Sequence, residues 1–236
     1  MFERLIRFES NGIEKLEGAP FPVVDGTVES GFRANSYPGR SSPLPHVPIF
    51  VCIGFNYHQH VNEANRTVIP YPVIFIKPAE SLADARSMLD YEDELGVVIG
   101  CDAFNVSEDD ALEYILGYTC ANDVSVRNFQ PSDASGGQYC FAKSFNKLAP
   151  SDLTRETRVN GSTRQSTSTS DMIWTVKQII AHASKGTTLH AGTVILSGTP
   201  AGIGLFCTRQ TLLKSGDEVE VYIDAIGTLR NKIVFE

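Results

Sequence analysis

The sequence lacks the features that mark several large classes of protein. It has no cluster of Lys and Arg, and its 236 residues carry a formal net charge of −8. This argues against a nucleic-acid partner, because nucleic-acid-binding proteins need a basic surface. No apolar run approaches the length that crosses a bilayer, and the N-terminal MFERLIRFES alternates like a strand without a signal-peptide core. We therefore expect no membrane partner either.

Cysteine is scarce and shows no pairing pattern. The five cysteines are odd in number and widely spaced, most lie inside apolar runs, and no CxxC occurs. This pattern predicts reduced thiols in an intracellular compartment rather than a disulfide framework. The cytoplasm is the expected location, and a mitochondrial location stays open.

What the sequence does contain is a series of short strand patterns. Apolar and β-branched residues cluster or alternate at residues 4–8, 49–54, 73–77, 89–100, 117–122, 193–197, 218–223 and 229–235. The Asn160-Gly161 pair predicts a hairpin. Helices are predicted from Ser107 to just before Gly117 and from about Ser170 to Ala183. Because strands outnumber helices without alternating with them, the expected fold class is a β-rich α+β fold.

A boundary between two parts is predicted near residue 45. Residues 26–47 are rich in Gly, Ser and Pro and resemble a linker. With 42% hydrophobic and 20% charged residues, the chain can bury a full core. We expect a small N-terminal piece with its linker at 1–45 and the main domain at 46–236.

Three carboxylates lie where strand patterns place side chains together. Glu92 and Glu94 are two apart within the 89–100 pattern, so in a strand they point the same way. They form either a solvated strand face or part of a cation site, because paired like charges repel unless something screens them. Asp123 follows the strand pattern at 117–122. An oxygen-only set of three suits Mg²⁺, Mn²⁺ or Ca²⁺ better than Zn²⁺.

Two other sequence features are candidates for chemistry. His60 and Glu63 are three residues apart, so one helical turn would put them on the same face. A His oriented by a carboxylate can activate water or move a proton, although such pairs also occur on ordinary helical surfaces. Lys143 lies between aromatic residues in FAKSF, which makes it a candidate for a pocket.

Several motifs in order resemble the fumarylacetoacetate hydrolase family. The resemblance runs from about Pro48 to the C-terminus, and RLIRFES is similar to the small leading domain of such proteins. The matching stretches are NYxxHxxE at 56–63, DYExEL at 90–95, GYTxxNDVSxRxxQ at 117–130, GGQ with KSF at 136–145, NGxxxQ at 160–165, DMI at 171–173, SGTPxGIG at 197–204, then KSGDxVEV and IGxLxN.

The resemblance implies a metal centre and a neighbouring cation. Glu92, Glu94 and Asp123 match the metal ligands of the family. Lys143 matches a lysine near the metal that would stabilise an enolate.

The resemblance also implies roles for residues that face the substrate. His60 and Glu63 match a dyad that would activate water or shuttle a proton, on a segment that can order over bound substrate. Arg127 and Gln130 match positions facing the substrate. Thr199 matches a residue that contacts the substrate carboxylate.

The implied fold is a twisted mixed β-sandwich roll with a small N-terminal β piece, assembled as a homodimer. The implied activity uses Mg²⁺ or Mn²⁺, with Ca²⁺ as a further candidate, and acts on a 2-keto acid through a metal-bound enolate. C–C hydrolysis of an acylpyruvate is the leading reaction. Oxaloacetate decarboxylation, keto–enol tautomerisation and a non-catalytic binding role are the alternatives.

The chain departs from the family in two places. Residues 78–88 are shorter than the loop that usually precedes the first metal ligand. Residues 150–158 are shorter than the strand-bearing segment that usually follows Pro150. These departures affect what the resemblance implies about the pocket rim and about stability.

Overall fold

A computed structural model of the chain describes residues 3–10, 13–20, 47–78, 88–127, 130, 154–207, 209–224 and 226–233. Seven strands of its main sheet are β1 (Glu3–Ser10), β2 (Ile13–Pro20), β3 (Phe50–Gly54), β4 (Val73–Lys77), β6 (Asp93–Ile99), β8 (Ile115–Asn122) and β13 (Val194–Leu196). A second sheet contains β10 (Thr154–Val159), β11 (Ser162–Ser168), β14 (Glu218–Ile223) and β15 (Gly227–Lys232).

The remaining elements are short. Two small strand pairs are β5 (Leu89–Asp90) with β9 (Ser125–Val126) and β7 (Ala103–Phe104) with β12 (Thr188–Leu189). The α-helices are α1 (His58–Glu63) and α3 (Val176–Ala183), and 3₁₀ helices span Ala111–Tyr114 and Thr169–Asp171. No helix within the described ranges is long and apolar enough to span a membrane.

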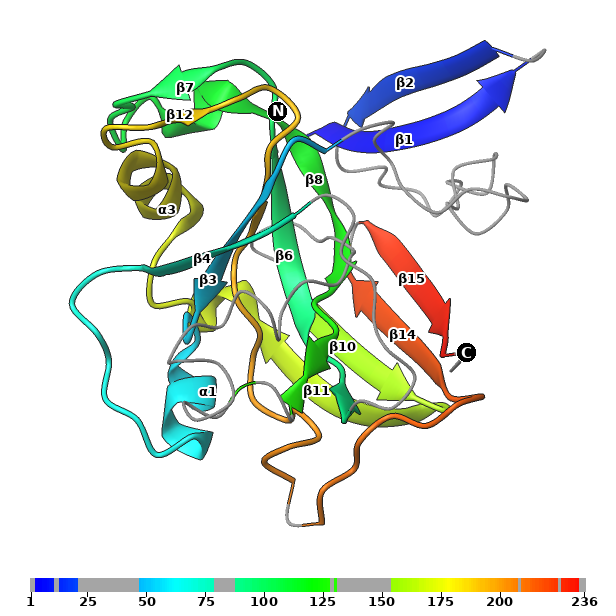
Figure 1. The fold of residues 1–236 in the computed structure, drawn as a ribbon. Coiled ribbons are helices and arrows are strands. Elements are labelled where there is room, and N and C mark those ends of the chain that lie inside the picture. The colour runs from blue at the N-terminus through cyan, green and yellow to red at the C-terminus, as the bar shows by residue number, and fades with distance from the viewer. Residues whose placement is uncertain are drawn as a thin grey trace.

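The main sheet is mixed and is covered on both faces. Its order is β2-β1-β8-β6-β13-β3-β4, with β13 parallel to β3 and antiparallel to β6. On one face, Leu95 and Val97 of β6 pack into a core cluster with Ile180 of α3. On the other face, Val98 packs into a cluster with Val221 of β14. Figure 1 shows α3 on one side of this sheet and β14 and β15 on the other. The expected β-rich fold is confirmed.

The sequence predicted one strand over residues 89–100, but the structure divides this stretch into two strands, β5 and β6. β5 pairs with β9, whereas β6 pairs with β8 and β13, and Tyr91 and Glu92 lie between the two strands. Every residue of β6 is buried, so neither face is solvated. The central position of β6 explains its continuous VVI run, because both of its faces lie in the core.

Both predicted helices are shorter than expected. Ser107 does accept a hydrogen bond from the Asp110 N–H at 3.2 Å, but a 3₁₀ helix follows and β8 begins at Ile115. Pairing with β6 therefore outcompetes the local helical preference. The second helix begins at Val176 rather than Ser170, because Thr175 and Gln178 form a capping box.

Several other predictions can be compared with the structure. The strands expected at 73–77 and 218–223 match β4 and β14, and Asn160-Gly161 joins β10 to β11 in a hairpin. The described part of the segment at 150–158 begins with Thr154 and belongs to a strand, β10. The linker at 26–47 lies outside the described residues except for Val47, and the boundary near residue 45 remains a prediction.

Candidate metal centre and active site

The three candidate ligands meet in the protein interior. Glu92 lies between β5 and β6, Glu94 lies on β6, and Asp123 follows β8. The Asp123 N–H donates to the Glu92 carbonyl at 2.6 Å, next to the antiparallel pairing of β6 with β8. One carboxylate oxygen from each residue lies within 4.8 Å of the others, and all three residues are buried. The triad can therefore hold a metal ion through oxygen ligands alone.

Each carboxylate of this triad is held by a donor from elsewhere in the fold. Arg127 Nη1 lies 2.7 Å from Glu92 Oε1. The Gly198 N–H donates to Glu94 Oε2 at 2.6 Å, and the buried Lys77 ammonium donates to Asp123 Oδ1. Such contacts fix the orientation of a ligand before a metal arrives.

Charge around the triad is not balanced among the described residues. Two further carboxylates, Asp90 and Asp93, are fully buried beside it. With all five acids ionised and the three buried bases protonated, this group of described residues carries two excess negative charges. The bases are Lys77, Arg127 and Arg155. A divalent cation would neutralise that excess, which otherwise makes ionisation of the cluster unfavourable.

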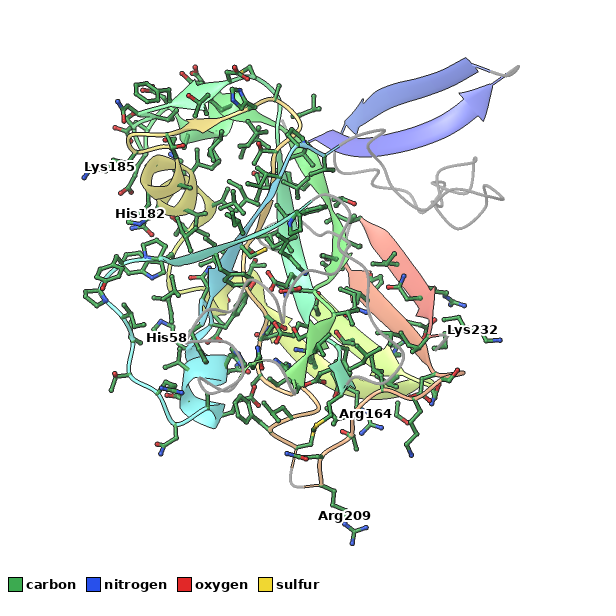
Figure 2. The ribbon with its side chains drawn as sticks, viewed as in Figure 1. His58, Arg164, His182, Lys185, Arg209 and Lys232 are labelled. Atoms are coloured by element: carbon green, nitrogen blue, oxygen red, sulfur yellow. The ribbon has the colours of Figure 1, made fainter. Side chains whose placement is uncertain are left out.

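His60 and Glu63 form a hydrogen-bonded pair on α1. His60 Nδ1 lies 2.7 Å from Glu63 Oε1, and the Gly202 N–H donates to Glu63 Oε2 at 2.9 Å. Because a carboxylate accepts, Nδ1 carries the hydrogen and Nε2 is left to accept a proton. His60 is buried, whereas His58 is exposed on the outer side of α1 (Figure 2). The pair thus has the geometry that proton transfer requires.

The start of α1 is also anchored. Asp171 accepts a hydrogen bond from the Gln59 N–H at 3.0 Å, and Tyr57 forms an isolated β-bridge with Met172. With the Glu63–Gly202 contact, α1 is tied at both ends to segments distant in sequence. Whether this segment rearranges over bound substrate remains a prediction.

Thr199 lies in the turn that follows β13, and a glutamine orients its hydroxyl. Gln165 Nε2 donates to Thr199 Oγ1 at 2.9 Å, while Gln165 Oε1 accepts from the Asp93 N–H at 3.1 Å. The turn needs glycine at 198, where φ is +99° and a Cβ would lie 2.8 Å from Asn56 Cβ. Gln165 thereby ties the Thr199 turn to the strand that carries Glu94.

The structure places Arg127 against acids. Its Nε donates to Asp90 Oδ2 at 2.8 Å, and its Nη1 donates to Gln130 Oε1 at 3.0 Å as well as contacting Glu92. Arg127 is thus positioned to orient Glu92. Its contact with substrate, and that of Gln130, remain predictions, and Lys143 lies outside the described residues.

Sequence reasoning missed a buried arginine that joins several parts of the site. Arg155 Nε donates to Asp93 Oδ2 at 2.9 Å, its Nη2 donates to the Asp93 carbonyl at 2.7 Å, and its Nη1 donates to the Tyr57 hydroxyl. Burial raises the pKa of Asp93, and the Arg155 guanidinium opposes that rise. Burial also raises the pKa of Tyr57 above its ordinary range, so its hydroxyl stays neutral.

Lys77 was missed as well, although its position carried a signal. It ends the VIFIK pattern of β4 with the same parity as the buried Phe75. A lysine on the inward face of a strand needs a partner, since a buried unpaired charge is costly. Arg155 alternates inward in the same way with Thr157 and Val159, but TRETRV is too polar to indicate which face is buried.

Comparison with known families gives a match over most of the chain. The family described as "Fumarylacetoacetate (FAA) hydrolase C-terminal" matches residues 49–234. This range includes every residue of the site described above.

Relatives and solved structures are similar over much of their length. The oxaloacetate tautomerase YisK of Bacillus subtilis is 38% identical, over 80% of this chain and 72% of its own. The caffeoylpyruvate hydrolase of Neonothopanus nambi is 41% identical, over 77% of this chain and 66% of its own. The solved fumarylacetoacetate hydrolase of Exiguobacterium antarcticum is 27% identical with a TM-score of 0.77, covering 99% of this chain and 100% of its own.

Proposed function

Because the chain belongs to the fumarylacetoacetate hydrolase family, whose named relatives are enzymes, we propose that it catalyses a divalent-metal-dependent reaction of a 2-keto acid. The reaction we propose is hydrolysis of the C–C bond of an acylpyruvate, a 2,4-dioxo acid. The observation that carries this proposal is the buried triad Glu92, Glu94 and Asp123 in a fold that also holds the His60–Glu63 pair.

The donor set fits Mg²⁺, with Mn²⁺ as the second choice and Ca²⁺ as the third. Mg²⁺ takes about six oxygen ligands, so three carboxylates would leave about three positions for water and substrate. The excess of two negative charges among the described groups supports a divalent ion over a monovalent one. When bound, the cation supplies a Lewis acid that polarises the keto group and stabilises the negative charge that develops there.

His60 is the residue that we propose handles the proton. Its Nε2 takes a proton from a water molecule, whose oxygen adds to C4 of the substrate. Glu63 holds Nδ1 and stabilises the imidazolium that forms. The C3–C4 bond then breaks, its electron pair passes to C3, and His60 returns the proton to C3. The products are a carboxylic acid and pyruvate.

Four other residues would surround the opposite end of the substrate. We propose that the Thr199 hydroxyl, oriented by Gln165, contacts the substrate carboxylate. Lys143 would add positive charge where negative charge develops, as its match to the family suggests. Arg127 and Gln130 would line the same region.

A tautomerase or decarboxylase acting on oxaloacetate is the second candidate. The similarity to an oxaloacetate tautomerase at 38% identity favours it. The same His60 could move a proton between C3 and the solvent without any bond being hydrolysed. This candidate needs the triad equally, so the metal does not separate the two reactions.

The test is an ultraviolet assay of acetylpyruvate and oxaloacetate, with Mg²⁺ and with EDTA, in which products are identified by NMR. Mg²⁺-dependent formation of acetate and pyruvate from acetylpyruvate supports hydrolysis. Pyruvate from oxaloacetate alone, or faster enol–keto exchange without net products, would assign the second candidate. Inertness of both compounds would favour a binding role or a narrower substrate.

A homodimer and a cytoplasmic location remain proposals. Exposed apolar side chains on β4 and the segment before it support a second copy as partner; they are Val68, Ile69, Tyr71, Ile74 and Ile76. Light scattering should then give twice the chain mass, and Ile76→Glu should give monomers.

Cysteines without disulfides at 52, 101, 120 and 207 agree with a reducing compartment, which cell fractionation would test.

A further inference from the structure

The imidazole of His60 lies against two phenyl rings. The Phe55 ring is stacked on it, with centroids 5.2 Å apart and an interplanar angle of 16°. The Phe206 ring is tilted by 48°, with its centroid 6.0 Å away. His60 is only 6% exposed, whereas Phe206 is 40% exposed. Phe206 therefore offers open apolar surface beside the residue that handles the proton.

Phe55 is held in place by its own backbone and by its neighbour. Its φ is +53°, a region that bulky residues rarely adopt. Asn56 fixes this turn, since its Nδ2 donates to the Ser197 carbonyl at 2.7 Å and its Oδ1 accepts from the Trp174 N–H at 2.7 Å. Backbone strain of this kind persists where the surrounding structure enforces it, commonly at functional sites.

Phe206 follows a backbone that is anchored at two successive residues. The N–H groups of Gly204 and Leu205 donate to the two carboxylate oxygens of Asp90 at 2.8 and 2.9 Å. Arg127 holds the same carboxylate. Phe206 is thus positioned through the acids around the candidate metal centre, and this arrangement is present without bound substrate.

Hydrolysis constrains where the acyl group of the substrate lies. The water that His60 activates attacks the C4 carbonyl, so the substituent on C4 must lie next to the imidazole and its two phenyl rings. We propose, on the basis of the proposed function, that Phe55 and Phe206 form the wall that receives this substituent. The enzyme then prefers acylpyruvates with an apolar, planar acyl group, such as an aromatic one.

An anionic acyl group gains nothing from the two phenyl rings. His60 and Glu63 together carry a charge of zero at most, so the pair offers no attraction to a second carboxylate. Arg209, three residues after Phe206, projects from the tip of its loop away from the body of the molecule (Figure 2). Oxaloacetate places a carboxylate at this end and makes no use of the two phenyl rings, so we expect it to be a poorer substrate than benzoylpyruvate.

The test compares benzoylpyruvate with acetylpyruvate in three proteins. The wild type should have kcat/KM about tenfold or more higher for benzoylpyruvate. Phe206→Ala should lower kcat/KM about tenfold for benzoylpyruvate and about twofold or less for acetylpyruvate. Phe104→Ala is the matched control, because Phe104 is 57% exposed on β7, at the opposite end of the molecule from α1 (Figure 1). It should change neither value.

A binding measurement separates contact with the acyl group from support of His60. Benzoate, the product, should inhibit the wild type more strongly than acetate, and Phe206→Leu should remove most of that difference. Equal losses for both substrates in Phe206→Ala would overturn the inference, as would oxaloacetate being the best substrate. If no acylpyruvate is hydrolysed at all, the proposed function itself fails, and the inference fails with it.

Discussion

Glu94 shows how a single residue of the candidate metal centre is built. Its Oε2 accepts from the Gly198 N–H, and Gly198 can occupy that turn only because it has no Cβ. Its neighbours Glu92 and Asp123 are oriented by Arg127 and Lys77. Three side chains are thus prearranged by donors from three separate parts of the chain, which favours tight binding of one small cation.

Replacing Glu94 by Gln should remove metal binding while keeping the fold. The amide has nearly the same shape, but it removes one negative charge and a strong oxygen ligand. We expect the dissociation constant for Mn²⁺ to rise at least about 100-fold, measured from the signal of free Mn²⁺ in electron paramagnetic resonance. The exposed Glu108→Gln is the control, and equal Mn²⁺ affinity in both variants would contradict the proposed site.

A second prediction at this scale concerns the Cys120 thiol. Desolvation of this half-buried thiol, with a further contribution from Asp93, raises its pKa to about 12 from an ordinary value of 9.0. The thiol is therefore neutral at pH 8 and should resist iodoacetamide, whereas the exposed Cys101 should be alkylated, as mass spectrometry would show.

The same shift has a consequence for stability at high pH. The unfolded chain loses this proton near pH 9 and the folded chain does not until about pH 12. The contribution of the thiol is thus complete below pH 9 and decreases as pH rises between the two values. Rapid alkylation of native Cys120 at pH 8 would contradict this account.

Among the elements, β10 connects the two halves of the site through Arg155. The guanidinium contacts Asp93, which lies in the chain between Glu92 and Glu94. It also contacts the hydroxyl of Tyr57, the residue that immediately precedes α1. Its centre also lies 4.9 Å from the centroid of the Tyr57 ring. One strand of the second sheet thereby keeps the His60 helix and the metal centre at a fixed separation.

Arg155→Met should be strongly destabilising, because it leaves Asp93 buried without its partner. The expected loss is about 3–5 kcal/mol, or about 10 °C in melting temperature for a chain of this length. Arg158→Met is the matched control on the same strand, where the exposed Arg158 pairs with Glu156. It should cost less than about 1 kcal/mol. Similar melting curves for the two variants, followed by circular dichroism, would argue against this role of Arg155.

The elements also show what the sequence could predict. β4 and β14 match to the residue because their apolar patterns are bounded by Pro, Gly or Asp. The break between β5 and β6 was missed, because Tyr91 and Glu92 continue the strand pattern while their partners change from β9 to β8. Local periodicity does not report which strand a residue pairs with, so such breaks come only from the tertiary fold.

The candidate site likewise contains residues that the sequence could predict and residues that it could not. The triad and the His60–Glu63 pair could be located from spacing and motif, since their chemistry requires those residue types. Lys77, Arg155 and the role of Gln165 depend on contacts 34 or more residues apart in the chain. No local pattern indicates such contacts.

At the scale of the whole molecule, the acids of the site lie in the interior, where the main sheet meets the second sheet. Among the described residues these acids outnumber the buried bases, and like charges held together in the interior destabilise the fold unless a cation is bound. The metal is therefore expected to stabilise the folded chain as well as to serve the reaction.

Removing the metal should accordingly lower the melting temperature. With the ion at about 100 times its dissociation constant, binding contributes about 2.7 kcal/mol, so EDTA should lower the transition by about 5–10 °C. The Glu94→Gln variant should melt at the same temperature with and without EDTA. A wild-type transition that does not respond to chelation would show that the cluster is balanced without a metal ion.

Incubation of acetylpyruvate in oxygen-18 water, with Mg²⁺ present and mass spectrometry of the products, distinguishes a hydrolase from a tautomerase. We expect acetate that carries one oxygen-18 atom, together with pyruvate, and loss of both products in His60→Ala. Acetylpyruvate that remains intact while its C3 protons exchange with solvent would contradict hydrolysis and assign a tautomerase.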